Sequence, residues 1–313
     1  MIFRTLLIYL TLALAVRAAA RDVMRTFAVT PGCTLQVDLD RGRIDVEETD
    51  GSEVRVAIHA EAGADTDQQA ERAVQGLQFD LRALNNTVVV RGRAPSETGW
   101  HFDRGNPAKL EIFCKISVPR RCSVELNTGQ GAITVGNLIG RVFARTEDGT
   151  IFVRRVEGPV DAATKSGDVI VSRCLGAATL QTRRGTIRAG TLGARAKLSN
   201  TTGDIEVLAA RAGVTAQAEA GDVTIGYPRD LTGDSDIRTS GGSIIVKIDP
   251  TADATIEASS IWGHVESKLP LTVESGGNGR SKFSGRLNRG GPVLRLHANG
   301  GNVSLMPGST PFE

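Results

Sequence analysis

The most regular feature of the chain is a glycine that recurs every eighteen residues and is followed two positions later by an apolar residue. It occurs at Gly131, Gly149, Gly167, Gly185, Gly203 and Gly221. Counted from each glycine, apolar side chains fall two, four, seven, eleven and thirteen positions on, as at Ile151, Val153, Val156, Val160 and Ala162. Alternation within each pair is the period of a β-strand. Each repeat therefore predicts two short strands and two turns.

Such a strand pair is too small to bury its inner face alone. Stacked copies, at about 4.8 Å per coil, would close a continuous core and pair the backbone groups of neighbouring coils. We therefore predict an all-β fold, a parallel β-solenoid of about eighteen-residue coils over residues 119–313, with further copies at Gly242, Gly263 and Gly301. A mostly threonine column precedes the glycines by three positions and predicts hydroxyls bonded from coil to coil: Thr128, Thr146, Thr164, Thr182, Asn200, Ala218 and Thr239.

Residues 21–118 lack the strict period and predict an irregular N-terminal β layer that covers the solenoid end. Residues 31–46 nevertheless resemble the first solenoid coil at 119–135. Thr66 to Gln69 has the form of a capping box before apolar residues at helical spacing, which predicts one short helix. The segment 77–93 predicts a hairpin that turns at Asn85-Asn86.

The first twenty residues have the form of a secretory signal peptide: Arg4, an apolar run from Leu6 to Val16, then small residues. We expect cleavage near Ala18 or Ala20, and hence an exported protein that is periplasmic, at the cell surface or secreted. The run is too short to span a bilayer, so no stable membrane span is expected after cleavage. An uncleaved anchor is the alternative.

Charge narrows the choice of partners. The chain has 37 basic and 35 acidic residues, and removal of the leader takes away Arg4 and Arg17, which leaves 35 of each. Binding to nucleic acid or to an anionic membrane usually accompanies an excess of Lys and Arg. The total therefore predicts no nucleic-acid partner, although it does not exclude a local basic patch.

The four cysteines occupy apolar positions, so we interpret them as core residues rather than necessary disulfides. Cys174 falls in the column of Val156, and Cys114 alternates in phase with Ile112. Cys33 and Cys122 each precede a repeat-type glycine by nine residues, which gives them equivalent inward places in two coils. They can form a bridge only if those coils are neighbours, and the sequence leaves this open.

No constellation of catalytic or metal-binding residues is evident, and we predict neither a cofactor nor an enzyme. The four histidines lie far apart, and His59 and His297 alternate with apolar neighbours and should face solvent. Asp168, Asp204 and Asp222 follow repeat glycines, but threonine, alanine and serine fill the rest of that column, which disfavours calcium. At the glycine turns, Glu147-Asp148, Lys165 and Arg183-Arg184 predict mutual neutralisation rather than a catalytic groove.

The loop from Pro95 to Pro107 contains Trp100, His101 and Phe102, an aromatic cluster in a chain with two tryptophans. It could be a recognition loop, since loops on rigid scaffolds commonly bind ligands. We favour a cap over the solenoid end, and we name these three residues as the candidate binding residues.

The T-x-x-G-x-I-x-V units, the segment PGCTLQVDLDRGRIDV and the late segment RGGPVLRLHANGGNVSL resemble a bacterial family of putative adhesins with β-strand repeats, a domain of unknown function. The resemblance covers about residues 27–306. It implies an extracytoplasmic role and brings no catalytic motif. We therefore expect a non-enzymatic adhesin-like binding or scaffold module of the cell envelope, with an unknown surface ligand and possible self-association through the solenoid ends. The alternative is a carbohydrate-active β-helix enzyme, which a clustered acidic groove would favour.

Overall fold

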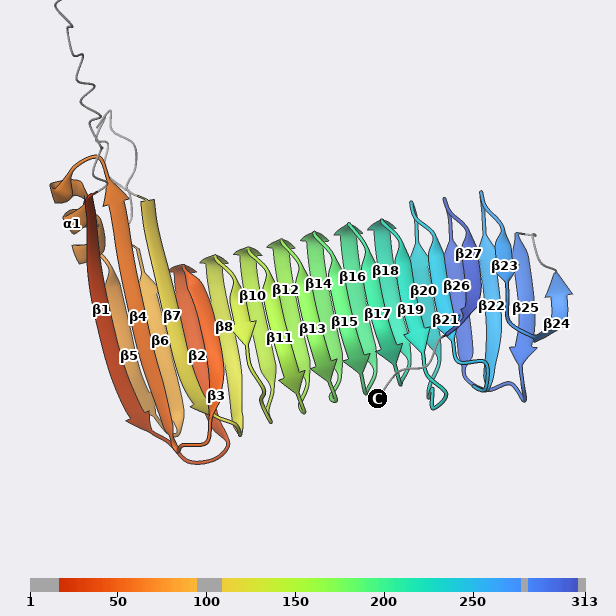
Figure 1. The fold of residues 1–313 in the computed structure, drawn as a ribbon, viewed down its shortest axis with the longest axis horizontal. Coiled ribbons are helices and arrows are strands. Elements are labelled where there is room, and N and C mark those ends of the chain that lie inside the picture. The colour runs from red at the N-terminus through yellow and green to blue at the C-terminus, as the bar shows by residue number, and fades with distance from the viewer. Residues whose placement is uncertain (1–16, 95–108, 277–280, 309–313) are drawn as a thin grey trace, which may run out of the picture.

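The computed structural model describes residues 17–94, 109–276 and 281–308, and shows an elongated solenoid made of two long sheets (Figure 1). One sheet has 13 strands and the other has 14, and most pairs are parallel. The predicted parallel β-solenoid is therefore confirmed. The described residues contain a single helix, α1 (Asp67–Gln75), at the N-terminal end.

The central coils each contribute one strand to each sheet. The 14-stranded sheet receives β8 (Cys122–Gln130), β10 (Val142–Asp148), β12 (Val160–Ser166), β14 (Ala178–Arg184), β16 (Ala196–Thr202) and β18 (Val214–Ala220). The 13-stranded sheet receives β9 (Ile133–Val135), β11 (Ile151–Val156), β13 (Val169–Cys174), β15 (Ile187–Leu192), β17 (Ile205–Ala210) and β19 (Val223–Tyr227). Partners stand eighteen residues apart, as Ile151 does from Val169 and Val169 from Ile187. The eighteen-residue period of the sequence is therefore also the separation in sequence between paired residues of neighbouring strands.

The inward columns form one continuous core. Val169 is fully buried, whereas its neighbour Ile170 points outward and is only partly buried, as the predicted strand phase requires. The threonine column lies at the turn and bonds neighbouring coils as expected: the Thr146 hydroxyl donates to the carbonyl of Gly131, and that of Thr164 to Gly149, each at 3.0 Å. Stacking therefore satisfies polar groups as well as burying apolar ones.

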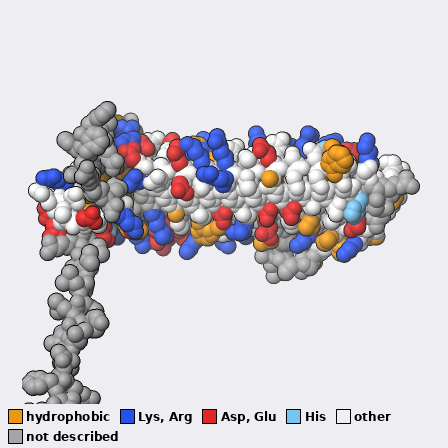
Figure 2. All heavy atoms as spheres, turned by 90° about the horizontal axis from the view of Figure 1, so that it is seen from above, with side chains coloured by type: hydrophobic (Ala, Val, Ile, Leu, Met, Phe, Trp, Pro, Cys, Tyr) orange, Lys and Arg blue, Asp and Glu red, His pale blue; other side chains and the backbone are white. Residues whose placement is uncertain are grey.

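The two long edges of the solenoid differ in their turns. At one edge, which we call the glycine edge, the strands of the 14-stranded sheet end in the turns that hold the repeat glycines. Acidic and basic side chains both occur along it (Figure 2), and Lys165 Nζ lies 2.5 Å from a carboxylate oxygen of Glu147. The predicted neutralisation is confirmed for this pair. At the opposite edge the strands of the 13-stranded sheet end, below β11 and β13 in Figure 1.

At the N-terminal end the coils are not stacked in sequence order. The strands are β1 (Arg17–Ala28), β2 (Cys33–Arg41), β3 (Arg43–Thr49), β4 (Glu53–Ala64), β5 (Gln78–Leu84), β6 (Thr87–Arg93) and β7 (Lys109–Pro119). The coil of β2 and β3 lies between β6 and β7 on one side and β8 and β9 on the other. Antiparallel strands β1, β4 and β5 finish this end.

The local predictions for this end are confirmed. Thr66 caps α1 by accepting a hydrogen bond from the backbone N–H of Gln69 at 3.3 Å. The hairpin of β5 and β6 turns at Asn85 and Asn86, both with positive φ (51° and 59°).

The C-terminal end is interleaved in the same way, which the repeat pattern did not predict. Its strands are β20 (Ser235–Thr239), β21 (Ile244–Ile248), β22 (Ala254–Ser260), β23 (Val265–Ser267), β24 (Leu271–Gly276), β25 (Lys282–Leu287), β26 (Val293–Ala298) and β27 (Val303–Pro307). The last coil in sequence, β26 with β27, is inserted between the coil of β20 and β21 and that of β22 and β23. Antiparallel β25 and β24 end the 14-stranded sheet.

Strand β1 overlaps the predicted leader, because it begins at Arg17 and pairs Ala20 with Glu61. Cleavage after Ala20 would leave Arg21 to Ala28 paired with β4. The leader and its cleavage stay predictions. No helix in the ranges described is long and apolar enough to cross a membrane.

Candidate functional site

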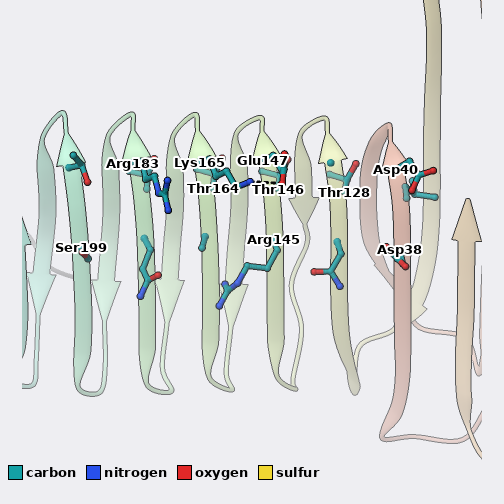
Figure 3. Close-up of a pocket in the computed structure, with 17 residues that line it drawn as sticks. Asp38, Asp40, Thr128, Arg145, Thr146, Glu147, Thr164, Lys165, Arg183 and Ser199 are labelled. Atoms are coloured by element: carbon teal, nitrogen blue, oxygen red, sulfur yellow. Dashed lines mark hydrogen bonds and ion pairs between the residues drawn. The ribbon is translucent and has the colours of Figure 1, made fainter. Parts of the chain in front are cut away.

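A shallow polar groove of about 710 Å³ runs across six neighbouring strands of the 14-stranded sheet, from β2 to β16, beside the glycine edge (Figure 3). Its floor is the outward column four positions before the repeat glycines: Asn127, Arg145, Ala163, Gln181 and Ser199. Its rim is the column two positions before them: Gly129, Glu147, Lys165, Arg183 and Thr201. We call this surface the polar groove.

The groove exists because one floor residue is small and one long side chain is held aside. Ala163 has only a methyl group between Arg145 and Gln181 on the neighbouring strands. The Arg145 guanidinium binds Asp161 at 2.8 Å and stacks over the Phe143 ring at 4.3 Å from its centre. This cation–π contact and ion pair keep the cation away from the rim, so the floor stays open at the middle coil.

The two ends of the groove differ in charge. On β2, Asp38 and Asp40 both form ion pairs with Arg93 of β6, the second at 3.0 Å. The hydrogen bond to Asp38 is the main cause of a raised pKa at Arg93, so this guanidinium stays charged. At the other end, the exposed Arg183 has no ion pair among the residues that the structure describes. The groove therefore runs from paired acids to a free cation.

Several polar groups of the groove have no partner in the protein. Within the described ranges, the side chains of Asn127, Gln181, Ser199 and Thr201 make no hydrogen bond to other residues. Asn127 lies on β8, Gln181 on β14, and Ser199 and Thr201 on β16, and each of these strands is paired with a parallel neighbour on both sides. The groove therefore presents a row of amide and hydroxyl groups that an extended polar ligand could bind without displacing internal contacts.

The sequence named other residues as the binding site. Trp100, His101 and Phe102 lie outside the described residues, so the recognition loop and the cap both stay predictions. The groove residues were missed because each looks like an ordinary solvent-facing strand position. The signal that could have found them is the alanine at 163, seen only when the floor column is compared across coils.

The cysteines lie where the pattern put them. Cys33 and Cys122 are direct partners on β2 and β8, buried, with their sulfurs 2.8 Å apart and both present as thiols. The condition for a bridge, neighbouring coils, is therefore met. Burial raises the pKa of Cys114 to about 12 and that of Cys174 to about 11, so these two thiols stay protonated.

The aspartates that directly follow repeat glycines have a structural role. Asp168 accepts a hydrogen bond from the backbone N–H of Thr186 at 2.8 Å, and Asp204 accepts one from Asp222 at 2.9 Å. Each carboxylate thereby satisfies a turn amide of the next coil, which explains aspartate at this position without a cation.

The histidines at positions 59 and 297 face outward, as predicted. His297 Nδ1 lies 2.8 Å from Ser259 Oγ on the neighbouring strand. In the described part of the chain, no carboxylate is hydrogen-bonded to this imidazole, whereas a serine nucleophile needs a base that a third group orients. The pair is therefore a surface hydrogen bond across two strands.

Fold and groove together define a β-solenoid whose polar groups are spread along the strands of one sheet rather than gathered in an enclosed pocket. The chain belongs to the Toastrack DUF4097 family, whose model matches residues 34–306. No curated protein matches the chain.

Solved structures with a similar course of the chain include a putative adhesin from Bacteroides fragilis and a putative lipid binding protein from Parabacteroides distasonis. The first is 13% identical, covers 91% of this chain and 97% of its own, and has a TM-score of 0.40. The second is 12% identical, covers 91% and 96%, and has a TM-score of 0.45. These values are too low to transfer a ligand or a function.

Proposed function

We propose that the protein is a non-catalytic binding module of the bacterial cell envelope, exported by its leader, that holds an extended polar ligand along the polar groove. The observation that carries the proposal is the set of unpartnered amide and hydroxyl groups along the polar groove: Asn127 at one end, and Gln181, Ser199 and Thr201 on the two neighbouring strands at the other. A linear glycan of the envelope or of a neighbouring surface has the matching chemistry, since its hydroxyl groups both donate and accept hydrogen bonds.

Rigidity favours such a role. The groove strands are paired on both sides by parallel neighbours, as β12 is by β10 and β14. A preformed surface loses little conformational entropy when a ligand binds, so weak contacts in several coils can add up. The unpaired Arg183 at one end adds a site for a carboxylate or sulfate substituent.

The alternative, a carbohydrate-active enzyme, needs two carboxyl groups in different environments, one of them able to hold a proton. Asp38 and Asp40 instead share one guanidinium, and Glu147 is paired with Lys165. Each groove carboxylate is thus engaged with a cation. This arrangement supports binding over hydrolysis.

The test is a screen of glycans and envelope fractions against the full chain, followed by matched variants. Gln181→Ala removes a floor amide, and Gln217→Ala removes the same group from the same column, one coil beyond the groove. Arg183→Ala and Arg184→Ala form a second pair, because both are exposed and only Arg183 lines the groove. A lost hydrogen bond should weaken binding about fivefold and a lost charged one about tenfold or more.

The controls should bind as the parent does. Equal losses in the two members of each pair would contradict the groove as the binding site. Release of shortened glycan by the parent protein would identify an enzyme instead.

A further inference from the structure

The solenoid edge opposite the glycine edge collects exposed arginines. We call it the arginine edge, and it lies at the lower ends of β11 and β13 in Figure 1. Seven of its arginines form no ion pair within the described ranges, and these seven lie in four neighbouring coils or in the turn that enters them: Arg120, Arg121, Arg141, Arg154, Arg155, Arg173 and Arg195. In the next coil, Arg211 is paired with Asp230 at 2.9 Å. Although the total charge of the chain is nearly balanced, this part of the edge therefore holds a local excess of cations.

The arginines on this edge stand close enough to repel one another. Arg155 and Arg173 are direct partners on β11 and β13, and like charges directly opposite each other destabilise a sheet. The nearby carboxylate of Glu48 is engaged by Asn137, which donates to it from its backbone at 2.8 Å and from its side chain at 2.5 Å. The carboxylate of Glu48 also interacts electrostatically with Arg154, and Glu157 is exposed in the turn after β11. Seven unpaired arginines outnumber these two carboxylates, so the edge keeps an excess of positive charge that an external anion would neutralise.

The tips between the arginines carry two apolar side chains and one acidic side chain. Eight positions after the repeat glycines the turns carry Ile139, Glu157 and Leu175, and Leu175 is 41% exposed. Arg155 and Arg173 lie on the side of the 13-stranded sheet, and Arg141 and Arg195 on the side of the other sheet. Since identical turns stack at a constant rise, the tips form a straight row that a flat partner can meet along its length.

We propose that the arginine edge is a docking surface for an anionic phospholipid membrane. Guanidinium groups bind phosphate in a bidentate way, and cations near an anionic leaflet contribute attraction that an exposed leucine can supplement by entering the headgroup region. A soluble polyanion would neutralise the arginines but would gain nothing from Leu175. This inference does not depend on the polar groove.

Docking in this way would orient the molecule. The polar groove lies beside the glycine edge, at the opposite end of the same strands from the arginine edge. A protein resting on its arginine edge would therefore hold the groove away from the membrane, where a ligand can reach it.

The test measures cosedimentation of the full chain with vesicles of phosphatidylglycerol and phosphatidylcholine, or of phosphatidylcholine alone, at about 0.1 M salt, where charges act over about 10 Å. The parent should cosediment with the anionic vesicles at about 0.1 M salt and dissociate from them at about 1 M salt. The variant Arg155→Ser with Arg173→Ser should bind roughly 30-fold more weakly, the equivalent of about 1 kcal/mol per arginine. The matched variant Arg41→Ser with Arg184→Ser loses the same charge from the glycine edge, outside the polar groove, and should bind as the parent does.

Two further measurements identify the partner. Leu175→Ser should weaken vesicle binding several-fold and leave binding to inorganic polyphosphate unchanged. A parent that binds both vesicle types equally, or an arginine-edge variant no weaker than its control, would overturn the proposal. Vesicle binding that is insensitive to Leu175→Ser but is competed by polyphosphate at equal phosphate would assign the edge to a soluble polyanion instead. If the variant Arg155→Ser with Arg173→Ser loses vesicle binding but still binds the ligand of the polar groove, the two proposals are tested independently of each other.

Discussion

The central coils and the two ends of the solenoid are built from the same strands but obtain their order differently. Between β8 and β19 each coil stacks on the one that precedes it in sequence, so every contact spans eighteen residues. At both ends, two coils that follow each other in sequence are separated by an inserted coil from another part of the chain. Antiparallel strands lie outside these coils. Sequential stacking lets a solenoid fray coil by coil from its end. An interleaved coil cannot leave without breaking pairs on both of its faces.

The largest expected effect concerns this difference. Removing residues 289–313 deletes β26 and β27, which hold β22 and β23 to the solenoid through parallel pairs. We expect β22 to β25 to become protease-sensitive, while hydrogen exchange of β10 to β17 stays protected, since those strands share no pair with the deleted coil. The measurement is limited proteolysis with hydrogen exchange, and removal of residues 309–313 is the control. A truncated protein in which β22 still resists protease would show that the end coil can restack without the insertion.

A charge in the central core is the next most damaging change. Val169 is fully buried and Ile170 points outward, in the column that holds Arg188 on the next strand. Val169→Lys should lower the free energy of unfolding by roughly 4 kcal/mol, because an unpaired buried charge is costly. Ile170→Lys should change it by less than about 1 kcal/mol. Denaturant unfolding of both variants checks the prediction, and equal losses would contradict the strand phase.

The repeat glycines should tolerate substitution less well than a glycine in an open turn of the irregular end. Gly167 has φ of 133°, and a methyl group on it would overlap the carbonyl oxygen of Gly149. Gly167→Ala should therefore cost roughly 3 kcal/mol through backbone strain and overlap. Gly51, between β3 and β4, has no atom closer than 3.8 Å to the same methyl group. Gly51→Ala should leave the thermal unfolding temperature nearly unchanged. A loss of stability as large as that of Gly167→Ala would contradict the predicted difference between the two glycines.

The sequence predicted the central coils because one period fixes both which residues face inward and which strands pair. It predicted α1 and the hairpin of β5 and β6 because capping and turn residues act locally. It did not predict the interleaving, since the copies at Gly263 and Gly301 have the same pattern whichever coil lies beside them. The groove and the arginine edge were missed because they are properties of columns: a small Ala163 among long neighbours, and Arg155 beside Arg173.

The contact between the inserted N-terminal coil and the central coils should depend on pH. Burial raises the pKa of Glu48, but the hydrogen bonds from Asn137, one from the backbone of Glu48 itself and the nearby charge of Arg154 together outweigh it and leave that pKa below the ordinary value of 4.5. A lowered folded-state pKa gives stability that is present above the ordinary value and is lost as the pH falls through the folded value. Glu48→Gln should therefore cost about 1 kcal/mol at neutral pH and progressively less below about pH 4.5. A difference between the two proteins that does not change with pH would contradict this role.

The smallest expected effect is a gain. The threonine column is broken at Ala218, which is 5% exposed and lies between Asn200 and Thr239 on the neighbouring strands. The Asn200 side chain donates to the Gly185 carbonyl and the Thr239 hydroxyl to the Gly221 carbonyl, each at 2.9 Å. By the same geometry, a hydroxyl at position 218 would face the carbonyl of Gly203.

Ala218→Thr should therefore stabilise the central coils by about 1 kcal/mol, the usual contribution of one hydrogen bond. The matched control is Ala216→Thr, two residues earlier on β18, where the side chain is fully buried in the core and a hydroxyl has no turn carbonyl to bind. That change should destabilise the protein, because it places an unpaired polar group in a packed interior. Denaturant midpoints of the two variants give the comparison. If Ala218→Thr leaves the midpoint unchanged, the column stabilises the stack through packing alone, and regular coils owe their order to the core rather than to hydrogen bonds at the turns.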